Sequence, residues 1–232
     1  MSQTPIRTIA FDAFGTLFDV FSVTALAERL FPGQGDAISR LWRQKQIEYT
    51  FLRTLSQRYE PFDAVTESAL RFALGALGIR AAEAQIRQLM AQYDCLTPFP
   101  ENLAVLQALK AEGVPMAILS NGTPRMLEVC TRHAGMTGLF DHLLSVDAVR
   151  QYKTTDAAYQ LAPDAFGVPA GNILFVSSNA WDAAGAGWFG FTTFWINRSG
   201  QPPEVLGVTP AATGNRLTDV LDFVRRHRAP SP

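Results

Sequence analysis

The first segment with residues suited to chemistry is 9–19, with the sequence IAFDAFGTLFD. Asp12 follows a short apolar run, and a Gly-Thr turn comes directly after it. A carboxylate at the carboxyl end of a buried strand lies where open α/β sheets place their active sites. Position 14 is a phenylalanine, whereas a site that handles phosphate would need a second acid there. The isolated carboxylate therefore predicts a nucleophile in an apolar pocket.

Three further segments are expected at the carboxyl ends of strands. They are 119–123 (LSNGT), 152–159, which contains Lys153 and Tyr159, and 175–182 (FVSSNAWD). In 119–123 a Ser-Asn pair leaves a strand just before a helix, where side-chain donors and free helix N–H groups can hold a carboxylate or a phosphate. Taken alone, such a pair is more often a helix N-cap, and a single loop lysine is usually solvated. All four segments in this order indicate one site.

The elements that must position these segments follow from the apolar periodicity of the chain. Short apolar runs predict strands, and apolar residues three and four apart predict helices. The expected strands are 7–11, 116–119, 143–145, 173–176 and 192–196, and the expected helices that separate and follow them are 103–112, 123–134, 155–166, 182–188 and 217–226. This alternation predicts an α/β fold, a Rossmann-like doubly wound parallel sheet with helices on both faces.

A block without strands interrupts the alternation after the first strand. Helices are expected there at 22–30, 36–55, 64–77 and 81–93. We therefore predict a Rossmann-like catalytic core formed by residues 1–18 and 98–232, with an inserted all-helical cap domain formed by residues 19–97. Because the insertion follows Asp12 directly, the cap is expected to cover the carboxyl edge of the sheet. A cap excludes water and supplies specificity, which predicts a substrate between cap and core.

The predicted helix 36–55 is apolar on two faces. Its main apolar stripe comprises Ile38, Leu41, Trp42, Tyr49 and Leu52. The second face carries Arg43, with Ile47 and Phe51 four and eight residues later. From the helix alone, Arg43 is equally consistent with a residue that faces a small cleft and with a surface arginine whose stem covers apolar neighbours.

The composition argues against several classes of function. A net charge of -1 over 232 residues gives no reason to expect nucleic acid or a membrane surface as partner. No segment resembles a signal peptide or approaches the ~18 continuous apolar residues of a membrane span, so a cytoplasmic protein is expected. Cys95 and Cys130 lack metal or CxxC spacing and are expected to be small buried hydrophobes. A Ser-His-Asp hydrolase is disfavoured because the sequence contains no G-x-S-x-G elbow.

Together these motifs resemble the haloacid dehalogenase superfamily, and within it the L-2-haloacid dehalogenase branch. The resemblance covers nearly the whole chain and is most specific in residues 12–19 (DxFGTLxD) and 177–182 (SSNxWD). Residues 119–122, Lys153 with Tyr159, and Arg43 also match. The resemblance implies a hydrolase in which an aspartate displaces halide from the α-carbon of an L-2-haloalkanoic acid with inversion. Water then cleaves the aspartyl ester and releases a D-2-hydroxyalkanoic acid.

The resemblance also implies a role for each matching catalytic residue. Asp12 is the nucleophile, oriented by Thr16, and Asp182 with Lys153 prepares the hydrolytic water. Ser177 and Asn179 are expected to position Lys153 and that water, with Tyr159 supporting the network. For Arg43, the resemblance favours a residue that faces the cleft over a surface arginine that covers apolar neighbours.

The substrate is expected to contact a second set of residues. Its carboxylate would rest on Ser120, Lys153 and nearby backbone N–H groups, while Arg43 and Asn121 would hold the departing halide. The expected walls of the alkyl side are Phe14, Ile47, Phe62 and Trp181. For Phe62, packing inside the cap is an equally good interpretation.

Two alternatives use the same scaffold. Magnesium-dependent phosphatases of the superfamily carry further acids where this chain has Phe14 and Ser178. Asp12 and Asp182 beside Lys153 would form a poor magnesium site, so the expected enzyme uses no metal and no organic cofactor. A catalytically silent binding module is the other alternative, and the presence of Asp12 and Lys153 argues against it.

The expected partners are a small 2-haloacid substrate and the released halide, without nucleic acid or membrane. The family is often dimeric, and the amphipathic cap helix is compatible both with a homodimer contact and with packing inside one chain.

Overall fold

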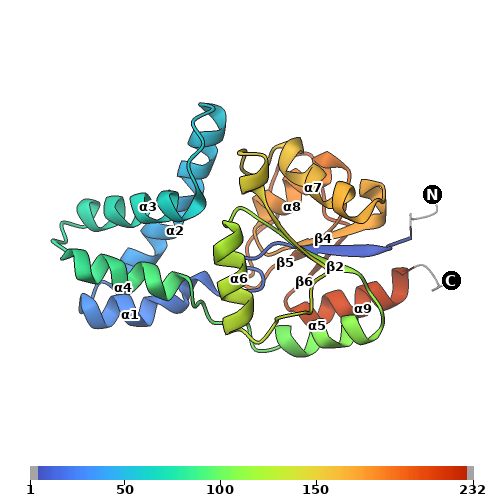
Figure 1. Cartoon of the computed structure of the whole chain (residues 1–232), viewed down its shortest axis with the longest axis horizontal. Helices are drawn as coiled ribbons and strands as arrows, with labels where there is room; N and C mark the ends of the chain where they lie inside the picture. The colour runs from blue at the N-terminus through green and yellow to red at the C-terminus, as the bar shows by residue number, and fades with distance from the viewer. Residues whose placement is uncertain (1–4, 229–232) are drawn as a thin grey trace.

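The computed structural model describes residues 5–228 and contains a six-stranded sheet in which every pair of neighbouring strands is parallel (Figure 1). The strands lie in the order β3-β2-β1-β4-β5-β6. Along the chain they are β1 (Thr8–Phe11), β2 (Met116–Ser120), β3 (His142–Ser145), β4 (Ile173–Ser177), β5 (Thr192–Ile196) and β6 (Ala212–Gly214). The five expected strands are confirmed. Strand β6 was missed because it is a three-residue edge strand without an apolar run.

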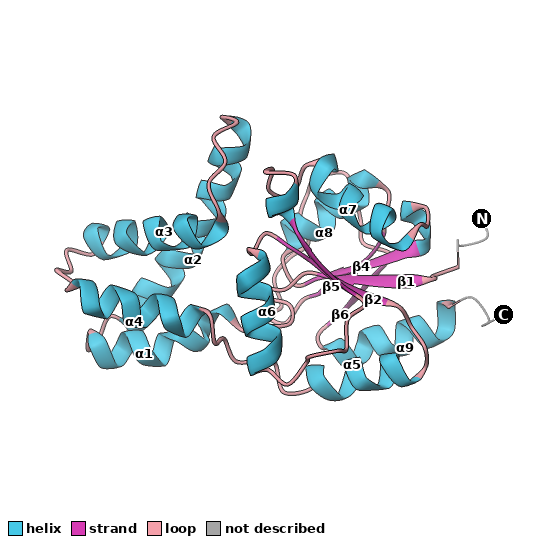
Figure 2. Ribbon diagram, viewed as in Figure 1, coloured by secondary structure: helices cyan, strands magenta, loops and turns pink. Residues whose placement is uncertain are grey.

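Helices cover both faces of the sheet. They are α5 (Asn102–Ala111), α6 (Pro124–His133), α7 (Asp156–Phe166), α8 (Ala180–Phe189) and α9 (Leu217–His227). Figure 2 shows α7 and α8 on one side of the strands and α5 and α9 on the other. Side chains of β4 alternate accordingly, since Phe175 packs with Tyr159 of α7 while Val176 belongs to the cluster that contains Val220 of α9. The doubly wound α/β fold is therefore confirmed.

Helix α8 begins two residues earlier than expected. It starts at Ala180, so Asp182 lies inside its first turn and Asn179 is the residue before the helix. A carboxylate in a first helical turn is stabilised by the helix dipole and by free N–H groups. This position points Asp182 and Asn179 toward the edge of the sheet where β1 and β4 end.

The residues between β1 and α5 form helices only, as expected. They are η1 (Val20–Val23), α1 (Thr24–Leu30), α2 (Gly35–Leu55), α3 (Phe62–Ala76) and α4 (Glu83–Tyr93), and Figure 1 shows them gathered beyond one edge of the core. The cap boundary at 19–97 remains a prediction. Residues 1–4 and 229–232 of the predicted core lie outside the described residues.

Helix α2 packs against α3 along most of its apolar stripe. Trp42 is buried, and its indole Nε1 donates to the Thr66 carbonyl oxygen of α3 (2.7 Å). Leu52 was wrongly placed in this stripe, since it is 52% exposed. The cause is geometric, because the carboxyl end of α2 extends beyond its neighbours (Figure 1).

Two further expectations concern membrane-spanning helices and the two cysteines. None of the helices in residues 5–228 is long and apolar enough to cross a membrane. Cys130 is buried as predicted, and burial raises the pKa of its thiol to about 12, whereas Cys95 is only partly buried.

Candidate active site

Asp12 lies at the carboxyl end of β1, where it is 6% exposed. Its backbone N–H donates to the Val176 carbonyl oxygen (2.9 Å), which fixes the residue at the sheet edge. Its Oδ1 accepts a hydrogen bond from Lys153 Nζ (3.1 Å), and Oδ2 accepts from Thr16 Oγ1 (2.9 Å) and Asn179 Nδ2 (2.8 Å). Residues from three of the four predicted segments therefore meet at this carboxylate.

The turn after Asp12 requires a glycine. Gly15 has a φ of 98°, in a region that residues with a Cβ rarely adopt. The Gly15 N–H donates to the Phe18 carbonyl oxygen (2.8 Å), which closes the turn. This turn brings Thr16 back toward Asp12, and the Thr16 hydroxyl also accepts a hydrogen bond from the Ser178 N–H (2.8 Å). The loops after β1 and β4 are thereby joined beside the carboxylate.

Lys153 lies buried between two carboxylates. Its Nζ donates to Asp12 Oδ1 and also to Asp182 Oδ2 (3.0 Å), and its side chain is 1% exposed. Tyr159 donates its hydroxyl to Asp182 Oδ1 (2.7 Å). The ring of Phe175 lies 4.8 Å from Nζ, which adds a cation–π contact. A fixed ammonium at this place offsets the repulsion between the two carboxylates.

Burial and charge act in opposite directions on these groups. Burial raises the pKa of Asp182 above its ordinary value, and the Lys153 ammonium offsets only part of that effect. For Lys153, burial alone would lower the pKa, but the Asp12 and Asp182 carboxylates outweigh burial and raise it. Burial also raises the pKa of Tyr159, so its hydroxyl keeps the proton that it donates to Asp182. Because its pKa is raised, Lys153 is an ammonium at neutral pH.

Arg43 reaches the core from helix α2 of the cap. Its Nη2 donates to the Phe14 carbonyl oxygen (3.0 Å) and to Asn179 Oδ1 (3.1 Å). Asn179 in turn donates through Nδ2 to Asp12 and to the Phe14 carbonyl oxygen (3.1 Å). The amide of Asn179 thus connects the guanidinium of the cap with the carboxylate of the core. Of the two interpretations of Arg43, the structure supports the one in which it faces the cleft.

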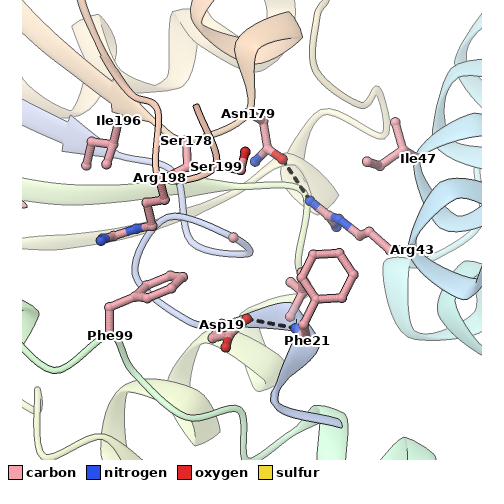
Figure 3. Close-up of a pocket in the computed structure, with 12 residues that line it drawn as sticks. Asp19, Phe21, Arg43, Ile47, Phe99, Ser178, Asn179, Ile196, Arg198 and Ser199 are labelled. Carbon is pink, nitrogen blue, oxygen red and sulfur yellow. Dashed lines mark hydrogen bonds between the residues drawn. The ribbon is translucent and has the colours of Figure 1, made fainter. Parts of the chain in front are cut away.

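A small cavity lies over Asp12 between cap and core. Its volume is about 10 Å³, roughly enough for one water molecule, and it is lined by Asp12, Phe14, Arg43, Ile47, Thr50, Phe62, Ser120, Asn121, Asn179 and Trp181. A larger cavity of about 340 Å³ shares Arg43, Ile47 and Asn179 with it (Figure 3). In Figure 3 the Arg43 side chain extends from α2 toward Asn179. Of the residues predicted to contact substrate, all but Lys153 line the small cavity.

The apolar walls come from both parts of the molecule. Phe14 of the core packs against Phe62 of α3, with ring centroids 5.4 Å apart, and is 3% exposed. Phe62 satisfies both interpretations given to it, because it is buried in the cap and also lines the cavity. Trp181 meets Phe51 of α2 edge to face at 5.3 Å. These contacts give the cavity an aromatic lining.

Three predicted residues act on the loops around the cavity. Ser120 Oγ accepts from the Gly122 N–H (3.1 Å), and Asn121 Oδ1 accepts from the Lys153 N–H (3.0 Å). Ser177 Oγ accepts from the Asn179 N–H (3.1 Å). Ser177 and Asn179 were expected to position Lys153 and the hydrolytic water. Within residues 5–228 neither bonds to Lys153, because Ser177 bonds to the Asn179 N–H and the Asn179 side chain bonds to Asp12, Arg43 and the Phe14 carbonyl oxygen. Their role toward the water stays a prediction.

The chain is similar to known proteins over most of its length. The haloacid dehalogenase-like hydrolase family matches residues 6–190. The chain belongs to this family.

Its relatives among these hydrolases are similar over nearly their full length. The (S)-2-haloacid dehalogenase H-109 of Pseudomonas putida is 46% identical over 220 residues, which cover 95% of this chain and 98% of the relative. The (S)-2-haloacid dehalogenase of Pseudomonas sp. (strain YL) is 51% identical and covers 94% of each chain.

Solved structures of the family superpose closely. The crystal structure of the L-2-haloacid dehalogenase RSc1362 has a TM-score of 0.94 at 58% identity, covering 96% of this chain and all 100% of that chain. The L-2-haloacid dehalogenase from Xanthobacter autotrophicus with chloropropionic acid covalently bound has a TM-score of 0.90 at 37% identity, covering 95% and 98%.

Two residues of the site in this haloacid dehalogenase-like hydrolase were missed by the sequence analysis: Thr50, which lines the small cavity, and Gln46, which contacts Arg43. Gln46 accepts a hydrogen bond from Arg43 Nη1 (2.7 Å) through its Oε1. The signal that could have found it is its spacing, since Gln46 follows Ile38 and Trp42 at intervals of four in the buried stripe of α2. A polar residue at a buried helical position needs hydrogen-bonding partners, so it indicates contacts with other polar side chains.

Proposed function

We propose that this chain catalyses the hydrolytic dehalogenation of L-2-haloalkanoic acids to D-2-hydroxyalkanoic acids. The observation that carries the proposal is the buried Asp12 carboxylate, which faces a small aromatic cavity and is held by Lys153, Thr16 and Asn179. The covalently bound chloropropionic acid in the relative from Xanthobacter autotrophicus supports an ester intermediate of the same kind here.

In the first step Asp12 attacks the α-carbon from the side opposite the halogen. A bond forms between the Asp12 oxygen and the α-carbon, and the carbon–halogen bond breaks with its electron pair leaving on the halide. Arg43 lines the cavity together with Asp12 and, with Asn121, would stabilise the departing halide. Stabilisation of developing charge by a positioned donor often contributes most to catalysis.

The substrate is held at its other end by different residues. Its carboxylate would be placed by Ser120, the Lys153 ammonium and neighbouring backbone N–H groups. Phe14, Ile47, Phe62 and Trp181 would bound the alkyl side and keep water from competing with the substrate. Because the cavity has room for only about one water molecule, its walls must move apart to admit the substrate.

In the second step water attacks the acyl carbon of the Asp12 ester. Asp182, with a pKa raised by burial, is suited to take the proton of that water, and Lys153 offsets the charge that forms. The acyl–oxygen bond breaks, and the departing alkoxide takes the proton held by Asp182 to become the product hydroxyl, whose oxygen is the former Asp12 oxygen. The Asp12 carboxyl releases the remaining water proton to solvent and is regenerated as a carboxylate. Thr16 and Asn179 hold the Asp12 carboxylate in place through both steps. Ser177 bonds to the backbone of Asn179, and Tyr159 bonds to Asp182.

The phosphatase alternative is not favoured. Lys153 Nζ contacts both carboxylates, at 3.1 Å and 3.0 Å, and so occupies the place that a divalent cation would share with them. Phe14 and Ser178 provide no carboxylate at the two positions where acids would be needed. A cytoplasmic location and a homodimer remain predictions.

Chloride release from L-2-chloropropanoate and from D-2-chloropropanoate, each with excess EDTA, tests the proposal. Release from the L form alone, unaffected by EDTA, is the expected result. Release that requires magnesium, or equal release from both forms, would contradict it.

A further inference from the structure

Gln46 lies at the centre of a buried hydrogen-bond network inside the cap. The residue is 0% exposed and bonds with side chains from three helices. Its Oε1 accepts from Arg43 Nη1 (2.7 Å) and from the Tyr93 hydroxyl (2.9 Å), and its Nε2 donates to Thr66 Oγ1 (2.7 Å). Arg43 and Tyr93 share the amide oxygen, and Thr66 faces the amide nitrogen.

The direction of this amide follows from the chemistry of its neighbours. The Thr66 hydroxyl has one proton, which it donates to the Phe62 carbonyl oxygen (2.6 Å), so it can only accept from Gln46. The Arg43 guanidinium has donors and no acceptor, so it must face the amide oxygen. Burial raises the pKa of Tyr93, whose phenol therefore remains a donor to the same oxygen. A flipped amide would lose the contacts with Arg43 and Thr66.

Gln46 holds one side of a guanidinium whose other side faces the reaction site. Nη1 of Arg43 is bound by Gln46, while Nη2 is bound by the Phe14 carbonyl oxygen and by Asn179 Oδ1. Tyr93, the second donor to Gln46, stacks on Phe14 with ring centroids 5.7 Å apart. The network therefore connects the orientation of Arg43 with the aromatic wall of the cavity.

We propose that Gln46 is a positioning residue for Arg43, which sets the direction of the guanidinium toward the departing halide. This inference rests on the proposed dehalogenase function. A neutral amide oxygen suits the task because it accepts a hydrogen bond without cancelling the positive charge that the halide needs. A carboxylate at the same place would hold the guanidinium but would also neutralise it.

Two substitutions separate these effects. Gln46→Glu keeps the shape and the acceptor for Arg43 but adds a negative charge and removes the donor to Thr66. Gln46→Met keeps the length but removes both the acceptor and the donor. Gln92→Glu is the matched control, because it adds the same charge on α4 of the cap, where Gln92 bonds to the Cys95 carbonyl oxygen (3.4 Å). Each variant is assayed with L-2-chloropropanoate and L-2-bromopropanoate, together with inhibition by bromide and the melting temperature.

The expected result is a change in leaving-group dependence. In both Gln46 variants kcat/KM for the chloro substrate falls by about 10-fold to 100-fold, less than the 10²–10³-fold typical of losing a direct donor. The bromo substrate loses less, because bromide needs less stabilisation, and bromide inhibits more weakly. Gln92→Glu stays within about 2-fold of the unmodified enzyme.

Three outcomes would overturn the inference. One is an unchanged chloro-to-bromo ratio in both Gln46 variants, and another is a loss of activity that only follows the fraction of folded protein. Failure of both variants to fold would likewise assign Gln46 a structural role. An unmodified enzyme that releases no halide from either substrate would instead contradict the proposed function itself, and this inference with it.

Discussion

At the scale of single residues, the two oxygens of Asp12 have different partners. Oδ1 contacts the Lys153 ammonium, and Oδ2 is held by Thr16 and Asn179. Charged and neutral donors together stabilise an ionised carboxylate while leaving it directed into the cavity. The chemistry proposed here therefore depends on one carboxylate and on the groups that prevent it from turning away.

Replacing Asp12 with asparagine keeps the shape of the side chain and removes the nucleophile. Turnover should fall by about 10⁴-fold or more, with little change in melting temperature. Halide release by the purified variant measures this, and the mass of the peptide that contains residue 12 shows whether deamidation has restored aspartate. Sustained turnover by a variant that still carries asparagine would contradict the assignment.

Tyr159→Phe removes the hydroxyl that donates to Asp182. That hydrogen bond favours the ionised carboxylate, so its loss raises the pKa of Asp182 further. Because ionised Asp182 is needed to accept a proton from water, activity falls as pH decreases through this pKa. The acidic limb of the kcat–pH profile should therefore move to higher pH in the variant.

The control for this profile is Tyr49→Phe, which removes a hydroxyl from a cap residue whose ring contacts Phe72. Its acidic limb should coincide with that of the unmodified enzyme. An acidic limb that moves to lower pH in Tyr159→Phe would contradict the role given to Asp182.

At the scale of elements, α8 connects the sheet with the lysine loop. Gly185 of α8 faces this loop, and an added Cβ there would lie 2.5 Å from Thr154 Cγ2 and 2.7 Å from the Tyr159 hydroxyl oxygen. Gly185 is therefore needed for close packing of a helix against the residue that follows Lys153.

Gly185→Ala should destabilise the protein by about 1–3 kcal/mol, because an overpacked site must shift. Gly75→Ala is the matched control, since Gly75 lies in α3 with nothing within 4 Å of its added Cβ. That change should stabilise the protein by roughly 0.5–1 kcal/mol through helix propensity. Urea denaturation measures both, and equal stabilities of the two variants would refute the packing argument.

At the scale of the whole molecule, the site is complete only when cap and core are together. The hydrogen bonds of Arg43 cross from α2 to the loops after β1 and β4. Tyr59 of the cap also donates to Asp147 Oδ1 of the core (2.5 Å). We therefore expect substrate binding between cap and core to require these cap–core hydrogen bonds.

Arg43→Ala should reduce kcat/KM by about 10²–10³-fold, the cost of losing a donor to developing charge. Its effect on stability should be small, with a fall in melting temperature of about 4 °C or less. Thermal unfolding and kinetics on the same sample measure both. A large fall in melting temperature with little loss of rate per folded molecule would favour the packing role instead.

The sequence predicted the fold and most of the site because β1, β2 and β4 carry apolar runs with a polar residue at or directly after their ends. The segment 152–159 was wrongly expected at a strand end, since β3 ends at Ser145. The sequence predicted less well what depends on tertiary geometry. Strand β6 is too short for a periodic signal, and Leu52 fits the stripe of α2 but lies beyond the helices that pack on it. Gln46 was missed because two of its three side-chain partners, Thr66 and Tyr93, are 20 and 47 residues away in the chain, and only the fold brings them to it.

The most direct test of the central claim is a single turnover of L-2-chloropropanoate in ¹⁸O-labelled water with enzyme in excess. If Asp12 forms an ester that water cleaves at the acyl carbon, the product carries unlabelled oxygen in its new hydroxyl group. The label then appears in the peptide that contains Asp12. Labelled product together with an unlabelled Asp12 peptide would mean that water attacks the substrate directly, and it would contradict the account.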